Sequence, residues 1–116
     1  RRVLPISSFG GGIGRMRQTC GAACGMFLLA GLEKGAVDGK DREGKAANYA
    51  LVQELAEEFK KRNGSMICAE LLGLKKPEGS STPEARTEQY YAKRPCAKMV
   101  EEAATIWAEY LEKQQE

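Results

Sequence analysis

The sequence contains no histidine, and this absence removes the side chain that most often carries protons in catalysis near neutral pH. It also removes the commonest metal ligand. A c-type haem is not expected either, because its Cys-x-x-Cys-His attachment motif is missing. Four cysteines are present among the 116 residues. Any chemistry that this chain performs is therefore expected to depend on sulfur.

Long apolar runs and a strong charge bias are also missing. The longest apolar stretch is residues 20–32, whereas a helix needs roughly 20 residues to span a bilayer. The 18 basic and 16 acidic residues leave a net charge of +2, too small to indicate a nucleic-acid partner. The cysteines are too sparse for a secreted disulfide scaffold, which favours a reducing compartment. We expect a cytoplasmic protein that neither inserts into a membrane nor binds nucleic acid.

No stretch alternates apolar and polar residues as a half-buried strand does, whereas several segments repeat apolar residues at intervals of three and four. This pattern predicts an all-α fold, a compact helical bundle of about four to five helices in one domain over residues 1–116. A short helical turn is expected from Glu84 to Tyr91, after a loop over residues 75–83. The first longer helix is predicted to begin at Met16 or Thr19 and to end at Glu33. The second is predicted to be capped by Asp41, to run to Arg62 and to be terminated by Asn63-Gly64. A short third helix, capped by Ser65, is predicted from Met66 to Leu72, and the last helix is predicted to begin at Pro95.

Each long helix is predicted to bury one apolar face. The predicted faces are Cys20, Cys24, Phe27, Leu28 and Gly31 in the first helix, Ala47, Ala50, Leu51, Leu55 and Phe59 in the second, and Cys96, Met99, Val100, Ala103, Trp107, Tyr110 and Leu111 in the last. Free cysteine is often buried as a small apolar residue. Simple packing is therefore an alternative explanation for every cysteine of the chain.

The first two cysteines, Cys20 and Cys24, are four residues apart, so a helix puts both sulfurs on one face. Their Cβ atoms would be roughly 5–6 Å apart, whereas a disulfide needs about 3.5–4.5 Å. The two thiols are not expected to bridge each other, but both can reach a third atom, either a metal ion or another sulfur. Their spacing also differs from the Cys-x-x-Cys motif of thioredoxin-like proteins.

Three of the cysteines lie close to predicted helix starts: Cys20, Cys68 and Cys96. Unpaired backbone N–H groups and the helix dipole favour a thiolate at such positions. Basic residues nearby in the sequence act in the same direction, namely Arg15, Arg17, Arg62, Lys93 and Arg94. This placement indicates reactive thiols.

A glycine-rich run at residues 10–14 precedes the first predicted helix. It does not fit the dinucleotide-binding fingerprint, because Arg15 stands where that pattern has glycine, and it lacks the Gly-Lys-Ser/Thr ending of a P-loop. We therefore expect a tight turn that sets the first helix against its neighbours rather than a phosphate site.

These motifs extend over most of the chain: Phe9–Met16, Cys20-Gly21-Ala22 with Gly25, Cys68–Gly73 and Lys93–Lys98. Together they resemble the redox-active proteins named for a CGAxxG motif and further single cysteines, the C_GCAxxG_C_C type. The resemblance implies a small bacterial helical protein whose redox-active residues are Cys20, Cys68 and Cys96. It places Cys24 at a variable position. It also implies a further cysteine on a helix upstream of the glycine run, which these residues do not include.

Three functions follow as hypotheses. In the first, Cys20, Cys68 and Cys96 perform thiol–disulfide or electron-transfer chemistry with a redox partner protein that the sequence does not identify. In the second, all four cysteines, Cys24 included, bind zinc or an iron–sulfur cluster as a set of thiolates. In the third, the chain is a non-catalytic interaction module whose cysteines only pack. An apolar groove left by the absent helix also suggests a homodimer. Enzymatic and carrier roles both stay open.

Overall fold

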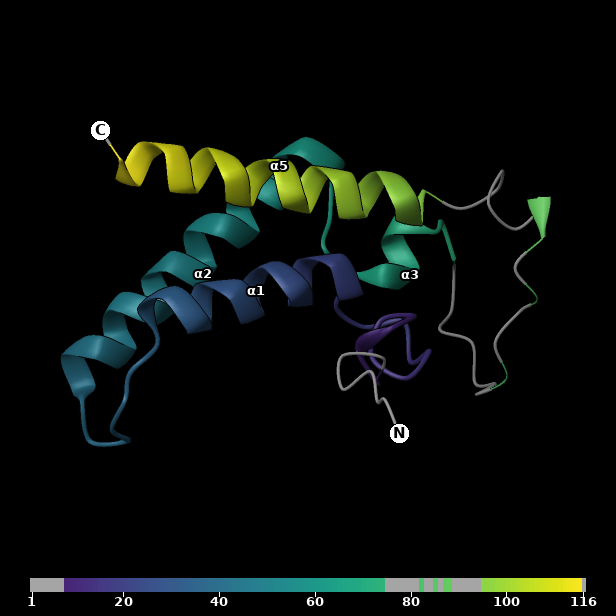
Figure 1. Cartoon of the computed structure of the whole chain (residues 1–116). Coiled ribbons are helices and arrows are strands. Elements are labelled where there is room, and N and C mark those ends of the chain that lie inside the picture. Colours follow the sequence, from purple (N-terminus) through teal and green to yellow (C-terminus); the bar gives the residue numbers. More distant parts are fainter. Residues whose placement is uncertain (1–7, 75–81, 83–84, 86, 89–94, 116) are drawn as a thin grey trace, which may run out of the picture.

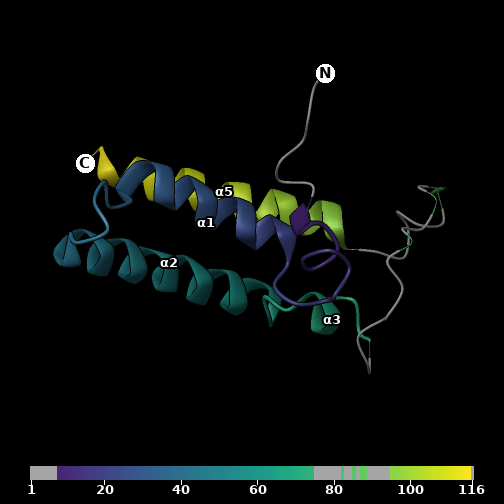
Figure 2. The ribbon, with the colours of Figure 1, turned by 90° about the horizontal axis from the view of Figure 1, so that it is seen from below.

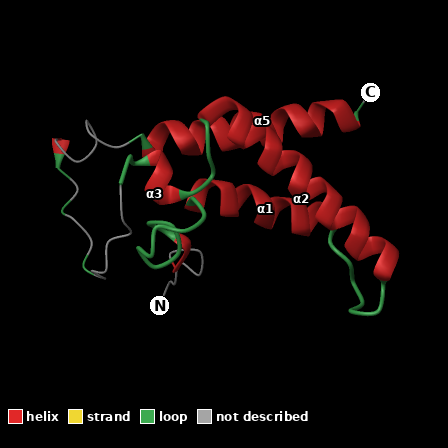
Figure 3. Ribbon diagram, turned by 180° about the vertical axis from the view of Figure 1, so that it is seen from behind, coloured by secondary structure: helices red, strands yellow, loops and turns green. Residues whose placement is uncertain are grey.

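The computed structural model describes residues 8–74, 82, 85, 87–88 and 95–115. Its helices are α1 (Gly21–Lys34), α2 (Arg42–Asn63), α3 (Cys68–Leu71) and α5 (Cys96–Gln114). Figure 3 shows no strand in this part of the chain, which confirms the all-α prediction. None of the described helices is both long enough and apolar enough to cross a membrane. The turn predicted over residues 84–91 and the loop over residues 75–83 lie largely outside the described residues.

The three long helices form the body of the fold. Helices α1 and α5 lie side by side, and α2 packs against the same side of both (Figures 1 and 2). The short helix α3 lies at the end of the body where α1 and α5 begin. Three helix starts are therefore gathered at one end of the molecule.

The ends of α2 are set by local chemistry, as the sequence predicted. The Asp41 carboxylate accepts a hydrogen bond of 2.9 Å from the Gly44 N–H and caps the helix. At the other end, Gly64 has a φ of 86°, a left-handed conformation that glycine adopts without strain, and its N–H donates to the Lys60 carbonyl. The predicted cap and the predicted end are both confirmed.

The hydrophobic core takes three fully packed residues from each long helix, spaced by three or four positions. They are Ala23, Met26 and Ala30 from α1, Leu51, Leu55 and Phe59 from α2, and Met99, Ala103 and Ile106 from α5. The alanines of α1 and α5 let the helix backbones come close, while Phe59 and Met26 fill the space between them. Partly buried Trp107 and Tyr110 extend the core, with their rings stacked 5.1 Å apart.

The predicted inner face of α1 is wrong in part. The buried positions are the alanines and Met26, while Leu28 on the predicted face is 52% exposed. Helix α1 is apolar on nearly every side, so the spacing of large side chains does not select one face. Close packing against α5 and α2 selects the small residues instead. Cys20 and Phe27, both predicted, do pack against the edge of the core.

Smaller errors affect the other two helices. Ala47 and Ala50 are exposed, because the packed part of α2 begins only at Leu51. Val100 is also exposed. The buried face of α5 consists of Met99, Ala103 and Ile106, and Val100, the residue after Met99, points away from that face. Ala56 and Ile106 are buried although the sequence pattern did not single them out.

An exposed ion-pair cluster ties α2 to α5. The Arg62 guanidinium donates through Nε to Glu58 at 2.9 Å and through Nη2 to Glu109 at 2.5 Å. The Arg62 hydrogen bond is the main cause that lowers the pKa of Glu58 below its ordinary value of 4.5. The Arg62 side chain therefore bridges α2 to Glu109 of α5, a residue 47 positions further along the chain.

We expect Arg62→Ala to lower the free energy of unfolding by about 1 kcal/mol or less, because both carboxylates are solvent-exposed. Since the pKa of Glu58 is lower in the folded protein, this contribution is present at neutral pH and is lost as the pH falls from about 4.5 through the folded pKa. Urea unfolding at several pH values measures it. Lys60→Ala is the matched control, since the ion pair of Lys60 with Glu57 lies within α2. If Arg62→Ala and Lys60→Ala lowered the free energy of unfolding equally at low and at high salt, a bridging role of Arg62 would be contradicted.

Candidate functional site

A left-handed loop leads into α1. Residues 11–15 and 17 all have positive φ, among them the non-glycine residues Ile13, Arg15 and Arg17 at 60–67°. The loop is closed by its own backbone, for example by hydrogen bonds of 2.8 Å from Gly14 to Ser8 and from Gln18 to Gly12. A right-handed helix cannot start inside such a segment. Helix α1 therefore begins at Gly21, later than the predicted Met16 or Thr19.

The chain before α1 pairs with the chain before α3. Thr19 and Ile67 form an isolated antiparallel bridge. On either side of it, the Cys20 N–H donates to the Met66 carbonyl at 2.7 Å and the Cys68 N–H donates to the Gln18 carbonyl at 2.6 Å. Two cysteines thus come from adjacent backbone segments that are locked together by hydrogen bonds.

The glycine loop packs against this pairing. A Cβ atom built on Gly12 would lie 2.5 Å from the Cβ of Cys68 and 2.7 Å from the Cα of Arg17. No real side chain fits such distances. The predicted tight turn is therefore present, and its use is to let the loop backbone reach the start of α3.

Cys20 is the N-cap residue of α1 and is half-buried. Burial raises the pKa of its thiol, although the backbone N–H groups of Ala23 and Ala22 face the sulfur and lower it. The nearby Cys68 and Cys96 raise the pKa further. The expectation that a helix start favours the thiolate is thus wrong for Cys20, because loss of solvent outweighs the helix N–H groups.

Cys68 is the first residue of α3 and is buried, with 8% of its surface exposed. The guanidinium of Arg17 donates from Nη1 to its sulfur over 3.6 Å. The predicted start of this helix at Met66 is two residues early, but Ser65 does act at the turn, where its hydroxyl accepts from the Ile67 N–H and donates to the Glu70 carboxylate. Cys68 is therefore held at a helix start beside a buried cation.

Cys96 and Cys24 differ from these two. Cys96 is the first residue of α5, directly after the N-cap Pro95, and is exposed. Cys24 lies one turn into α1 and is half-buried; burial and then the neighbouring Cys20 raise the pKa of its thiol. All four thiols are free in the structure.

The structure brings the helix starts that carry Cys20, Cys68 and Cys96 to one end of the bundle. Cys20 is within electrostatic reach of Cys68 and Cys96, and Cys24 is within reach of Cys20. In the described part of the chain, no group of three or more cysteine and carboxylate side chains is arranged to hold a metal ion. The three thiols differ in exposure: Cys96 is exposed, Cys20 is half-buried and Cys68 is buried.

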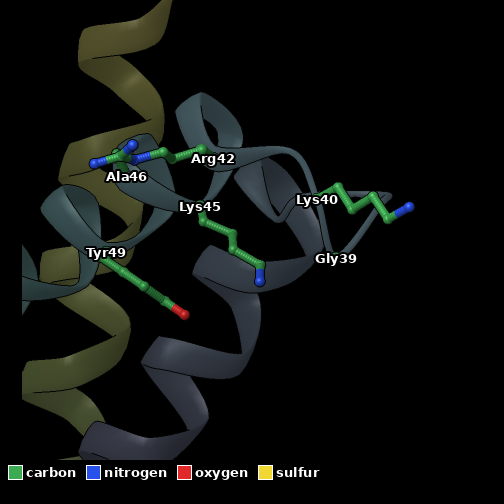
Figure 4. A pocket seen from close by; sticks show the side chains of 6 residues that line it. All are labelled: Gly39, Lys40, Arg42, Lys45, Ala46 and Tyr49. Carbon is green, nitrogen blue, oxygen red and sulfur yellow. The ribbon is translucent and has the colours of Figure 1, made fainter.

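An open hollow of about 360 Å³ lies elsewhere, at the start of α2, and Gly39, Lys40, Arg42, Lys45, Ala46 and Tyr49 line it. In Figure 4 the Lys45 and Tyr49 side chains point toward α1, whereas Lys40 extends away into solvent. The start of α2 lies at the opposite end of the bundle from α3 (Figure 1). The hollow therefore lies apart from the sulfur site, by which we mean the end of the bundle that carries Cys20, Cys68 and Cys96.

Two contributors were not identified as site residues from the sequence. In the sequence, Arg17 is one of several cations near the cysteines, and Gly12 is one residue of a predicted turn. The pairing of residues 18–20 with 66–68 joins segments almost 50 positions apart, and no local spacing encodes it. The density of glycines before the first helix was the one available signal.

We expect Gly12→Ala to disturb the site far more than Gly14→Ala. Both positions have left-handed φ, so both variants incur backbone strain of roughly 1–2 kcal/mol. Only the Gly12 variant forces a side chain into Cys68, since nothing lies within 4 Å of a Cβ at Gly14. Urea unfolding and the alkylation rate of Cys68 measure the difference. Equal effects in the two variants would show that the loop does not support Cys68 through close contact.

The raised pKa of Cys20 predicts slow alkylation near neutral pH and a rate that climbs as the pH passes above 9.0, its ordinary value. The free energy of unfolding follows the same shift. The stability contributed by the protonated Cys20 thiol is fully present below about pH 9.0 and is lost as the pH rises through the higher pKa of the folded protein. Iodoacetamide labelling with peptide mass spectrometry and unfolding of wild type and Cys20→Ser measure both effects. Alkylation of Cys20 as fast as that of the unfolded chain at neutral pH would contradict the shift.

Comparison with known proteins gave one family match. The sequence model of the family described as Putative redox-active protein (C_GCAxxG_C_C) matches residues 3–110. The match covers the glycine loop, the four cysteines and all described helices except the end of α5. No curated protein and no solved structure matched the chain.

Proposed function

We propose, since the chain belongs to the redox-active protein family of the C_GCAxxG_C_C type, that it performs thiol–disulfide exchange through Cys20, Cys68 and Cys96. Family membership supports a general redox role. The observation that supports this specific chemistry is the backbone pairing at Thr19 and Ile67, which holds Cys20 and Cys68 on adjacent segments, while α5 begins with Cys96 at the same end of the bundle.

Exposure suggests the order of events. Exposed Cys96 can meet the disulfide of a partner protein, whereas Cys20 is half-buried and Cys68 is buried. A thiolate must approach a disulfide sulfur directly for exchange to occur. Cys96 is therefore the entry thiol, and Cys20 and Cys68 are the pair that stores the disulfide.

The exchange conserves atoms and electrons at each step. The Cys96 thiolate attacks one sulfur of the partner disulfide, and the other partner sulfur leaves with the bonding electron pair. The Cys20 thiolate then attacks the Cys96 sulfur and expels the partner's second thiolate. Finally Cys68 attacks Cys20 and releases Cys96. The net change is oxidation of two thiols to a Cys20–Cys68 disulfide, and the two protons that these thiols lose are taken up by the partner's two thiolates, which become a dithiol.

The proposed pair is poised rather than bonded. Residues diagonal to each other across an antiparallel pair are typically about 7–8 Å apart at Cα, and a disulfide needs somewhat less, usually 4.4–6.8 Å. Cys20 and Cys68 occupy such diagonal positions beside the Thr19–Ile67 bridge. A small shift at the start of α3 would close the bond, whereas the two thiols are free in the structure.

We expect reduced protein treated with glutathione disulfide to lose two of its four free thiols and to form a Cys20–Cys68 crosslink. Trapping with an alkylating reagent and mapping the peptides by mass spectrometry measures this. Cys20→Ser is expected to abolish the crosslink, because it removes the central sulfur. Cys96→Ser is expected to slow exchange with a protein disulfide more than with this small oxidant.

Cys24→Ser is the matched control, since Cys24 lies beside Cys20 but is not needed for the exchange, and the crosslink should persist in it. Four free thiols before and after oxidation would reject the proposal in favour of a packing role. Protein purified anaerobically with bound zinc or an iron–sulfur chromophore, and with its thiols protected from alkylation, would reject it in favour of metal binding.

A further inference from the structure

Arg17 is buried to an extent that is unusual for a cation. Only 2% of its surface is exposed, and it ranks with Phe59 and Met26 among the largest fully buried side chains of the described residues. A guanidinium stays charged at all ordinary pH values and is rarely buried without compensating partners. Its burial therefore points to a group that benefits from a nearby positive charge.

The sulfur of Cys68 is such a group. Nη1 of Arg17 donates to it over 3.6 Å in a buried setting. A neutral thiol is only a weak acceptor, whereas a thiolate next to a guanidinium gains both a hydrogen bond and charge neutralisation. The same residue also fixes the backbone there, because its carbonyl accepts from the Ala69 N–H at 3.2 Å. Arg17 thus contacts both the first turn of α3 and the sulfur that begins it.

The backbone of Arg17 strengthens this argument. Its φ of 60° is a left-handed conformation that favours glycine and strains other residues. A glycine would relieve that strain but would leave no guanidinium beside Cys68. Strained backbone positions concentrate at functional sites, where the surrounding structure holds them. Here the strained residue is the one that carries the buried charge to the sulfur.

We propose that Arg17 is a positioning residue that stabilises the thiolate of Cys68 during exchange. The inference rests on the proposed function for its chemical step. When the Cys96 thiolate attacks the Cys20 sulfur of a Cys20–Cys68 disulfide, the reverse of the last exchange step, the S–S bond breaks and the electron pair goes to Cys68. A Cys96–Cys20 disulfide forms, and the guanidinium stabilises the departing sulfur. Arg17 therefore makes Cys68 the better leaving group of the pair.

The test compares Arg17→Met, Arg17→Lys and Arg17→Gly with wild type, using the full chain. Peptide mass spectrometry gives the alkylation rate of Cys68 as a function of pH, and equilibration with a glutathione buffer gives the fraction of Cys20–Cys68 disulfide. We expect the Met variant to alkylate Cys68 about tenfold more slowly near neutral pH, with a pH profile displaced upward. The Lys variant should recover part of the rate, because it keeps the charge.

Arg15→Met is the matched control. Arg15 shares the loop and the left-handed φ, but its guanidinium donates to the Thr82 carbonyl and not to a sulfur. This variant is expected to leave the Cys68 profile unchanged. Arg17→Gly separates folding from charge, since it removes the guanidinium while relieving the backbone strain. It should fold, as circular dichroism checks, and still show the displaced profile.

The outcomes separate the two proposals. An unchanged Cys68 pH profile in folded Arg17→Gly and Arg17→Met protein would overturn the role of Arg17, even if wild type forms the disulfide. A displaced profile in a protein that never forms the disulfide would reject thiol–disulfide exchange and retain the effect of Arg17 on the sulfur. A profile displaced equally by Arg15→Met would overturn the specific contact in favour of a general effect of loop charge.

Discussion

The backbone pairing between residues 18–20 and 66–68 is the constraint on which the sulfur site depends. It joins the start of α1 to the start of α3 through short hydrogen bonds, and the glycine loop folds against it. Cys20 and Cys68 lie at those two helix starts, so the hydrogen bonds that fix the backbone there also position the two thiols. Since the pairing forms during folding, the entropy of bringing Cys20 and Cys68 together is lost then and not in the step of the proposed exchange that joins them.

Burial and reactivity oppose each other at this site. Half-buried Cys20 has a raised pKa, which protects the reduced protein from stray oxidation but slows attack near neutral pH. The buried cation Arg17 acts on the opposite sulfur, that of Cys68. The end of the bundle therefore combines a protonated thiol with a sulfur beside a positive charge. In the proposed exchange, this asymmetry favours cleavage of the disulfide with Cys68 as the leaving group.

Much of the fold could be predicted from the sequence, because helix caps and apolar repeats are local signals. Asp41 and Gly64 marked the ends of α2, and three cysteines were predicted to lie at helix starts, where the structure has them. The inner face of α1 could not be predicted, because a helix that is apolar all round has no distinct stripe. The roles of Gly12 and Arg17 also could not, since both depend on a contact between segments far apart in the chain and on left-handed backbone that no short motif specifies.

The stacked pair of Trp107 and Tyr110 has a practical consequence. Trp107 is the single tryptophan of the chain and lies in the second half of α5, at the edge of the helical core. The sulfurs are at the other end, where α5 begins with Cys96. Intrinsic tryptophan fluorescence therefore reports on the packing of α5 against the core, at a position away from the cysteines. In one sample, Trp107 fluorescence measures loss of tertiary structure, while a thiol count measures the oxidation state of the cysteines.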